Sequence, residues 1–416
     1  MGNNIFIHSI VLKIASRCNI NCTYCYMYNM GDTSYLTQPK AISEKTIDQL
    51  CVRIKEHCEE HDVKVFNIYL HGGEPLLVGK KKFVKIIEQF KKLENDHLKI
   101  QLSIQTNGIL VDEEWCDIFL KYSIIVGISL DGNKEFNDLN RLDHKGEGTY
   151  DRVVKGIDIC RSKLKNHPFG ILTVLNIESD PVEAYEHFKQ LGILGADFLL
   201  LDQNYDHFDK NNIDKSASWL INVFDNWIQE KDYFSIRFFE VIIRSILGGA
   251  YNVDLLGSST NNVLVIETNG GIEAVDVLKI CGESFTKNSL NIFDNNFNEA
   301  FNNDLAKVYY NSGNYLPKKC LACPVNAICG GGFIAHRYSS KNGFNNPSVY
   351  CDDLLKLITY IQNKTVDEMP ESLRKETGIE KLTYEEANQI IEDTLPLIPE
   401  PNYVELLESF RKKEYA

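Results

Sequence analysis

The sequence predicts an α/β protein: an incomplete parallel barrel of six strand–helix units, followed by a smaller cysteine-rich domain and a helical tail. Three observations predict this fold. Short apolar runs alternate with longer amphipathic segments as far as about residue 205. Polar signatures follow each of the first four apolar runs. Seven of the twelve cysteines fall into two compact groups, one in each half of the chain.

The six apolar runs have the length and composition of buried strands. They lie at residues 10–14, 65–70, 100–105, 124–130, 170–175 and 198–201. Amphipathic segments predict helices at residues 43–60, 80–93, 149–163 and 181–191, and Ser43 is a plausible helix start. Strands and helices that alternate in series form parallel strands with right-handed crossovers. A (β/α)6 partial barrel fits this count, and an open doubly wound sheet remains possible.

The second half of the chain changes character. Residues 213–247 have helical patterning, and two apolar runs at 262–267 and 272–278 flank Asn269-Gly270-Gly271, which predicts a hairpin. Helical periodicity returns at residues 354–361, 384–391 and 403–410. The predicted organisation is therefore a core at 1–212, a helical bridge at 213–255, a cysteine domain at 256–360 and a helical extension at 361–416.

Composition excludes several classes of function. The 58 acidic residues against 44 basic ones give a net charge of −14, which argues against nucleic acid as the main partner. No apolar run reaches the roughly 18 residues of a membrane span, and the N-terminus lacks the pattern of a signal peptide. We therefore expect a cytoplasmic location, no membrane partner and no disulfides among the twelve cysteines.

The first cysteine group is Cys18, Cys22 and Cys25, with three and then two residues between the thiols. Three thiolates can hold three irons of a [4Fe–4S] cubane, which leaves the fourth iron open to a small molecule. Zinc is the alternative metal, but it normally takes a fourth protein ligand, and His8 is the only histidine nearby in the chain. The spacing therefore favours an iron–sulfur cluster with a reactive iron.

Polar segments at the ends of successive strands predict that the site lies on one rim. The cysteine loop follows the first strand, Gly72-Gly73-Glu74-Pro75 the second, Thr106-Asn107-Gly108 the third and Ser129-Leu130-Asp131-Gly132 the fourth. Because sites in parallel α/β folds gather at the carboxyl ends of the strands, we expect these segments to meet.

This loop resembles the signature of the radical S-adenosylmethionine (SAM) superfamily, whose core is a partial (β/α)6 barrel. The resemblance implies that SAM binds the open iron and that cluster reduction releases a 5′-deoxyadenosyl radical. It also implies an external electron donor such as flavodoxin or ferredoxin. Gly72, Gly73 and Glu74 resemble the motif that contacts the methionine ammonium. Further cofactor contacts implied by the resemblance are Tyr24 and Leu175 beside the adenine, Gln105 and Ser129 along the ligand, and Arg141 at its carboxylate.

The second cysteine group offers four thiolates, a complete set for a closed [4Fe–4S] cluster or for zinc. Its members are Cys320, Cys323, Cys329 and Cys351. The spacing resembles the SPASM domain of peptide-modifying radical enzymes, which usually carries two auxiliary clusters. Here Phe333 and the pair Val275 and Asp276 stand where that family has cluster ligands. We therefore predict one auxiliary cluster, two [4Fe–4S] clusters in all, and a buried free thiol at Cys281.

Three segments carry a more specific resemblance, at residues 266–276, 329–338 and 343–351. They are similar to the maturases that build three-residue cyclophanes in ribosomally made precursor peptides. The resemblance implies an oxidoreductase that joins an aromatic ring to an unactivated β-carbon. Asp276 is the candidate base, and His336 and Arg337 line the peptide channel or pack around the cluster. A thioether-forming or sulfatase-activating maturase and a non-enzymatic iron–sulfur carrier or sensor are the alternatives.

Overall fold

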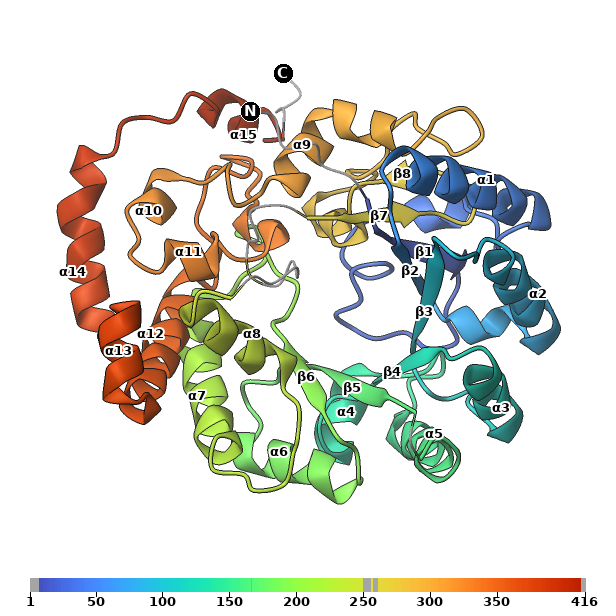
Figure 1. The fold of residues 1–416 in the computed structure, drawn as a ribbon, viewed down its shortest axis with the longest axis horizontal. Coiled ribbons are helices and arrows are strands. Elements are labelled where there is room, and N and C mark those ends of the chain that lie inside the picture. The colour runs from blue at the N-terminus through green and yellow to red at the C-terminus, as the bar shows by residue number, and fades with distance from the viewer. Residues whose placement is uncertain (1–6, 166, 250–255, 257–260, 413–416) are drawn as a thin grey trace. The chain divides into compact units, whose positions relative to one another are not determined.

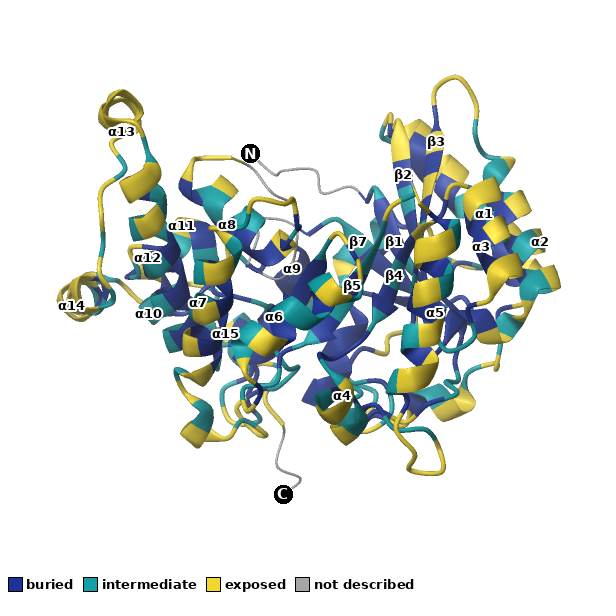
Figure 2. Ribbon diagram, turned by 90° about the horizontal axis from the view of Figure 1, so that it is seen from below, coloured by how far each residue is buried: buried dark blue, intermediate teal, exposed yellow. Residues whose placement is uncertain are grey.

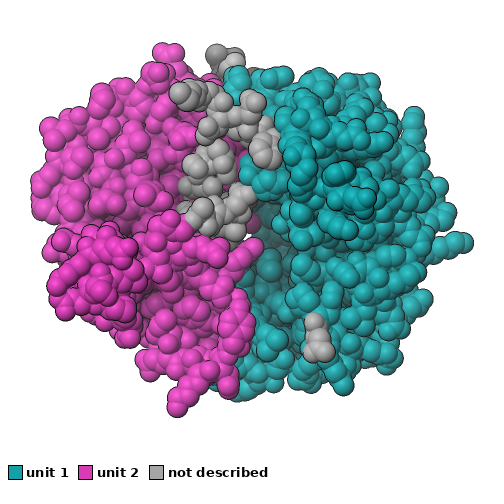
Figure 3. All heavy atoms as spheres, viewed as in Figure 1, with its two compact units in different colours: residues 1–176, 186–199, 262–307 teal, residues 177–185, 200–261, 308–416 magenta. Residues whose placement is uncertain are grey.

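The computed structural model describes residues 7–165, 167–249, 256 and 261–412. They fall into two compact units, each described here by itself (Figure 3). Unit 1 comprises residues 1–176, 186–199 and 262–307, and unit 2 comprises residues 177–185, 200–261 and 308–416.

Unit 1 is built on one sheet whose order is β6-β5-β4-β3-β2-β1-β7-β8 (Figure 1). The strands are β1 (Ser9–Ala15), β2 (Val65–Gly72), β3 (Lys99–Thr106), β4 (Ile125–Ser129), β5 (Phe169–Val174), β6 (Ala196–Leu199), β7 (Val263–Ile266) and β8 (Ile272–Glu273). The first six are parallel, and each lies beside its neighbour in sequence. A doubly wound sheet reverses its strand order at a switch point. This order does not reverse, so the predicted partial barrel is confirmed.

The predicted hairpin is present, with Val265 opposite Glu273 and Ile266 opposite Ile272. Its position differs from the expected domain boundary at 256, because β7 also pairs in parallel with β1 and so belongs to unit 1. The edge of β1 offers unpaired backbone groups that β7 satisfies. The second apolar run is also mostly not a strand, since β8 ends at Glu273 and a 3-10 helix, η4 (Asp276–Cys281), follows.

The helices predicted between the strands are confirmed. The first begins as expected at Ser43, whose Oγ accepts a hydrogen bond from the backbone N–H of Thr46 at 3.0 Å. The helices up to residue 190 are α1 (Glu44–Glu60), α2 (Lys80–Lys91), α3 (Glu113–Lys121), α4 (Lys134–Asn140), α5 (Tyr150–Lys163) and α6 (Pro181–Gln190). Figure 2 shows buried residues along every strand of the parallel sheet, exposed residues on β2 and β3, and exposed outer faces on α1, α2 and α5.

The later helices lie mostly in unit 2. They are α7 (Lys215–Trp227), α8 (Arg237–Ile246), α9 (Asp304–Tyr310), α10 (Lys318–Leu321), α11 (Asn326–Cys329), α12 (Cys351–Glu368), α13 (Glu371–Thr377), α14 (Tyr384–Thr394) and α15 (Val404–Glu408). Short 3-10 turns are η1 (Ser34–Thr37), η2 (Pro75–Val78), η3 (Lys210–Asn212), η5 (Asn298–Asn302), η6 (Ile334–Arg337) and η7 (Leu395–Leu397). Within the described ranges, no helix combines the length and apolar character that crossing a membrane requires.

The end of β2 lies directly against the segment that leads into the cysteine loop. Gly72 has φ +145°, and a Cβ there would lie 2.0 Å from the carbonyl oxygen of Ala15. A Cβ on Gly73 would lie 2.1 Å from the hydroxyl of Tyr28, and the Gly73 N–H donates to Ala15 at 2.9 Å. The two glycines therefore allow the end of β2 to approach the segment that leads into the cysteine loop.

Replacing Gly72 with alanine is expected to destabilise the fold by at least about 3 kcal/mol, because a positive φ and a backbone clash act together. Gly79 is the matched control: it has φ +75°, and an added Cβ would meet nothing within 4 Å. Gly79→Ala has the strain of a positive φ but no clash, so it should lose less than Gly72→Ala, roughly 1–3 kcal/mol. Urea unfolding of both full-length variants measures the difference, and equal losses would show that the Ala15 contact does not require the glycine.

Candidate active site

The three cysteines after β1 occupy one tight loop that a second segment, residues 140–144, holds in place. The N–H of Asn21 donates to Leu142 O at 2.7 Å, and the N–H of Thr23 donates to Asn140 O at 2.9 Å. The imidazole Nε2 of His144 lies 2.9 Å from the Cys18 carbonyl oxygen. The sequence analysis did not single out His144, and no motif in the chain marks it.

The thiols of this loop suit a metal centre chemically. Burial raises the pKa of Cys18 to about 12 and of Cys25 to about 11, and it also raises the pKa of Cys22. Without a metal these thiols stay protonated, and bound iron would replace the protons. Within the described part of the chain, no three His, Cys, Asp or Glu side chains converge on one ion. In a cubane each thiolate binds a different iron, so its ligands surround a volume instead of a point.

Glu74 joins the ends of β2 and β3, and its side chain is fully buried. Its Oε1 accepts from the Leu76 N–H at 3.0 Å and the Thr106 hydroxyl at 2.8 Å, and its Oε2 accepts from the Asn107 N–H at 2.8 Å. The Glu74 N–H donates to Arg17 O at 3.0 Å, which adds the cysteine loop to this junction. Burial raises the pKa of Glu74, and these donors oppose that shift. The carboxylate thus has internal partners that the sequence analysis did not anticipate.

Asn107 is a site residue that the sequence analysis named only as part of a polar segment. Its Nδ2 donates to Asn19 Oδ1 at 2.7 Å and lies 3.7 Å from the Cys18 sulfur. Gln105 Nε2 donates to Ser129 Oγ at 2.8 Å, which joins the ends of β3 and β4. Leu175 follows β5 and is buried, and its N–H donates to Leu199 O.

Tyr24 forms hydrogen bonds with both Arg141 and Asp131. The Tyr24 hydroxyl donates to the Asp131 carboxylate, and Arg141 Nη1 donates to the Tyr24 oxygen at 3.0 Å. Asp131 Oδ1 accepts from the Val174 N–H at 3.0 Å. The Nε of Arg141 is buried, with no hydrogen-bond partner among the described residues. An orphaned guanidinium donor is an unusual feature of a protein interior, and it fits a site that receives an anionic ligand group.

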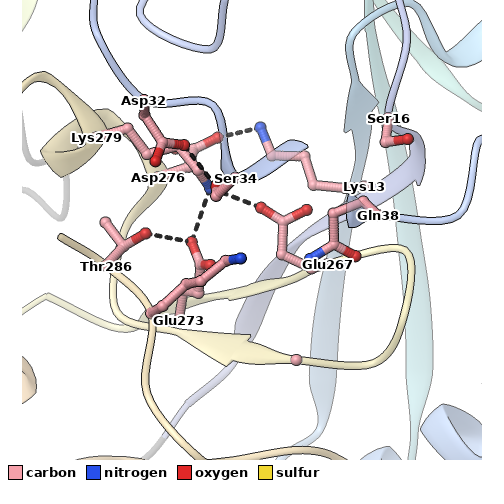
Figure 4. Close-up of polar contacts among 12 residues, drawn as sticks. Lys13, Ser16, Asp32, Ser34, Gln38, Glu267, Glu273, Asp276, Lys279 and Thr286 are labelled. Atoms are coloured by element: carbon pink, nitrogen blue, oxygen red, sulfur yellow. Dashed lines mark hydrogen bonds and ion pairs between the residues drawn. The ribbon is translucent and has the colours of Figure 1, made fainter. Parts of the chain in front are cut away.

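Asp276 lies in a buried charged group at the same end of the sheet (Figure 4). Its Oδ2 forms an ion pair with Lys13 of β1 and accepts from the Tyr26 hydroxyl at 2.8 Å. Lys13 Nζ also lies 3.2 Å from His71 Nδ1. Burial by itself raises the pKa of Asp276, but the positive charges around it, chiefly the Lys13 ammonium with Lys279 as a further one, together hold that pKa well below its usual range. Burial and Lys13 lower the pKa of His71 to about 4, so its imidazole is neutral at physiological pH.

A second ionic group fills the hairpin, where the sequence lacks cluster ligands. Lys279 Nζ lies 2.7 Å from Glu267 and 2.8 Å from Glu273, and the Thr286 hydroxyl donates to Glu273 at 2.8 Å (Figure 4). Burial raises the pKa of Glu273, and Lys279 opposes the shift. Cys281 is buried as predicted, and none of the twelve cysteines forms a disulfide.

In unit 2 the four remaining predicted ligands come together. Cys320, Cys323, Cys329 and Cys351 line one small pocket. They come from α10, the turn after it, the end of α11 and the start of α12. Burial raises the pKa of Cys320 to about 12 and of Cys351 to about 11, so this set also suits a bound metal.

Phe333, His336 and Arg337 pack beside this second set. The ring of Phe333 packs edge-on against buried His336 at 5.4 Å. Arg337 is fully buried and donates to the carbonyl oxygens of Ser312 and Phe344, each at 3.2 Å. These contacts are of the packing kind that the sequence analysis gave as one of two possible roles for His336 and Arg337.

Comparison with known proteins relates this architecture to radical enzymes. Residues 12–191 match the sequence profile of the radical SAM superfamily. The cysteine-type anaerobic sulfatase-maturating enzyme of Clostridium perfringens (strain 13 / Type A) is 27% identical over 367 residues, which cover 85% of this chain and 95% of that protein. Native anSMEcpe with bound AdoMet and Cp18Cys peptide has a TM-score of 0.73 at 25% identity, covering 86% of this chain and 98% of that one. Streptococcus suis SuiB bound to precursor peptide SuiA has a TM-score of 0.54 at 18% identity, covering 80% and 73%, and shows likeness of fold alone.

Glu74→Gln is expected to destabilise the protein by about 1–3 kcal/mol, because the new amide N–H faces backbone or hydroxyl donors that have no other acceptor. Glu44→Gln is the matched control, since Glu44 is exposed and only pairs with Lys85 at 3.0 Å. The control should unfold in urea like the unchanged chain. Equal unfolding midpoints for the two variants would contradict the role of Glu74 as a junction.

Proposed function

Since residues 12–191 match the radical SAM superfamily, we propose that this chain is a radical enzyme that modifies a ribosomally made precursor peptide. Its product on this proposal is a cyclophane, in which a carbon–carbon bond joins an aromatic ring to a β-carbon. The observation that carries the proposal is the buried convergence of the cysteine loop with the polar ends of β2, β3 and β4.

The residues of this rim fit the cofactors that the family uses. Cys18, Cys22 and Cys25 would hold a [4Fe–4S] cluster with one open iron, and SAM would bind there. The bound pair supplies a 5′-deoxyadenosyl radical that abstracts hydrogen from carbon. The free Nε of Arg141 supports a contact with the SAM carboxylate. The other proposed SAM contacts are Tyr24, Gly72, Gly73, Gln105, Ser129 and Leu175, while Glu74 orders the rim through its internal hydrogen bonds.

The choice of product rests on the number of auxiliary clusters. The pocket lined by the second cysteine set offers one four-thiol site in the described part of unit 2. Phe333 and Asp276 stand at positions where the SPASM family has ligands of a second auxiliary cluster. Here Phe333 packs on His336, and Asp276 pairs with Lys13. Within unit 1, the buried group of Lys279, Glu267 and Glu273 occupies the hairpin. These contacts support a single auxiliary cluster, held by Cys320, Cys323, Cys329 and Cys351, and with it the cyclophane-forming class.

Sulfatase maturation is the second candidate, and one observation favours it. The Clostridium perfringens sulfatase-maturating enzyme is 27% identical over 85% of this chain. The two reactions differ in their products: a cyclophane loses two hydrogens and keeps its side-chain atoms, whereas maturation of a cysteine exchanges sulfur for an aldehyde oxygen. An external one-electron donor such as flavodoxin or ferredoxin serves either reaction.

Anaerobic reconstitution should load roughly eight irons per chain, four in each [4Fe–4S] cluster. Cys18→Ala and Cys320→Ala are each expected to lose about half of this iron, because each substitution removes one thiolate ligand from one of the two clusters. Cys281→Ala is the control and should keep all of it. Iron and sulfide assays with electron paramagnetic resonance measure the loading. Loss of iron in Cys281→Ala would place a cluster at the hairpin and contradict the single auxiliary cluster.

The product test uses synthetic peptides in which tryptophan, phenylalanine or tyrosine begins a three-residue segment, with the Cp18Cys peptide as the rival substrate. The reconstituted enzyme with SAM and dithionite should convert an aromatic peptide to a species lighter by two hydrogens. Tandem mass spectrometry should show no cleavage within the crosslinked segment. Formation of an aldehyde on Cp18Cys, with every aromatic peptide unchanged, would instead establish sulfatase-type maturation.

A further inference from the structure

The buried pair of Lys13 and Asp276 is more constrained than an ordinary ion pair. Lys13 is fully buried on β1, and the Asp276 side chain keeps only 10% of its exposure. Three groups hold the ammonium: the Asp276 carboxylate, the Nδ1 of His71 at 3.2 Å, and the ring of Tyr26 with its centroid 5.8 Å away. A neutral His71 accepts a hydrogen bond from the ammonium and does not compete for the carboxylate. Lys13 is therefore held in one position.

The carboxylate is anchored on one side only. Both Lys13 and the Tyr26 hydroxyl bind Oδ2. Oδ1 has no hydrogen-bond partner among the described residues, and the side chain is not wholly sealed. Tyr26 directly follows Cys25, and Lys13 lies five positions before Cys18, so the pair borders the cysteine loop. The anchored geometry leaves Oδ1 as the oxygen that can receive a proton.

We propose that Lys13 is a positioning residue that keeps Asp276 ionised and aimed, so that Asp276 accepts the ring proton in the last step of crosslinking. This inference rests on the proposed function. In that step the β-carbon has already bonded to the ring. The ring then loses one electron to an acceptor of the iron–sulfur class and one proton to Asp276, which becomes a neutral carboxylic acid. The carbon–hydrogen bond breaks, its electron pair restores the aromatic ring, and charge balances.

The ion pair also sets the order of the two losses. A carboxylate stabilised by an ammonium is a weak base, because protonation breaks the pair. It accepts a proton only from a strong acid, and the ring adduct becomes one after its electron has left. Electron loss therefore precedes proton loss. The charged and titratable groups that face Asp276 are Lys13 from β1, His71 from β2, Tyr26 from the cysteine loop and Lys279 from η4.

The first measurement needs no substrate and follows the melting temperature of the full-length chain with pH. In the unchanged protein, a depressed Asp276 pKa adds stability above the carboxyl's unfolded pKa of about 3.9. In Lys13→Met, burial without the ammonium raises that pKa, so the melting temperature should fall as pH rises from 4 to 8 relative to the unchanged protein. The double variant Lys13→Met/Asp276→Asn, which removes both charges of the pair, should lose this fall. Lys85→Met, at an exposed ion pair, is the control and should follow the unchanged curve.

The second measurement uses the aromatic peptide that yields the crosslink. Lys13→Met should raise the ratio of 5′-deoxyadenosine to crosslinked peptide by about a hundredfold, the lower range for loss of a positioned base. Its residual crosslinking should decline as pH falls from 8 to 6, whereas the unchanged enzyme shows no such decline. A Lys13→Met melting curve parallel to the unchanged one overturns the inference. Failure of the unchanged enzyme to crosslink any peptide overturns the proposed function instead, and the melting curves still decide the dependence of Asp276 on Lys13.

Discussion

The buried carboxylate of Glu74 is the contact on which the candidate site depends. A carboxylate that is shielded from solvent needs hydrogen-bond donors from the protein. Here those donors come from the turn after β2, the last residue of β3 and the turn that follows it. The same residue's N–H reaches the carbonyl of Arg17, one position before the first cysteine of the loop. Three strand ends that lie far apart in the sequence are thereby held in register. Gly72 and Gly73 serve the same junction, because a side chain at Gly72 would clash with Ala15 and one at Gly73 would clash with Arg17 and Tyr28.

Charge is concentrated inside unit 1 at the end where the cysteine loop lies. Lys13 pairs with Asp276, and Lys279 pairs with Glu267 and Glu273. Buried ions of this kind stabilise little in total, because desolvation offsets most of the Coulomb attraction. Their value lies in geometry: each ion is held by several partners and has little freedom to move. Such fixed partners suit the role proposed for this region, in which a radical and a proton must be controlled.

The hairpin shows how one segment can serve two purposes. Strand β7 covers the free edge of β1, and the turn and short β8 then direct the chain into η4, which begins with Asp276. A chain segment that completes the sheet therefore also carries Asp276, the proposed base. The ionic group around Lys279 links the strands and the turn of this hairpin to η4.

Much of this arrangement was determined by the sequence alone. The period of the apolar runs predicted all six parallel strands, Ser43 predicted the start of α1, and the cysteine spacings predicted two metal-binding sets. Local patterns suffice for these features because helices, strands and thiol loops depend on near neighbours in the chain. Only the tertiary structure decided that β7 pairs with β1, that the Glu74 carboxylate accepts hydrogen bonds from groups within the protein, and that Asp276 is paired with Lys13. Residues 13 and 276 carry no local signal for one another, since their ion pair exists only once β1 and η4 have been brought together by the sheet.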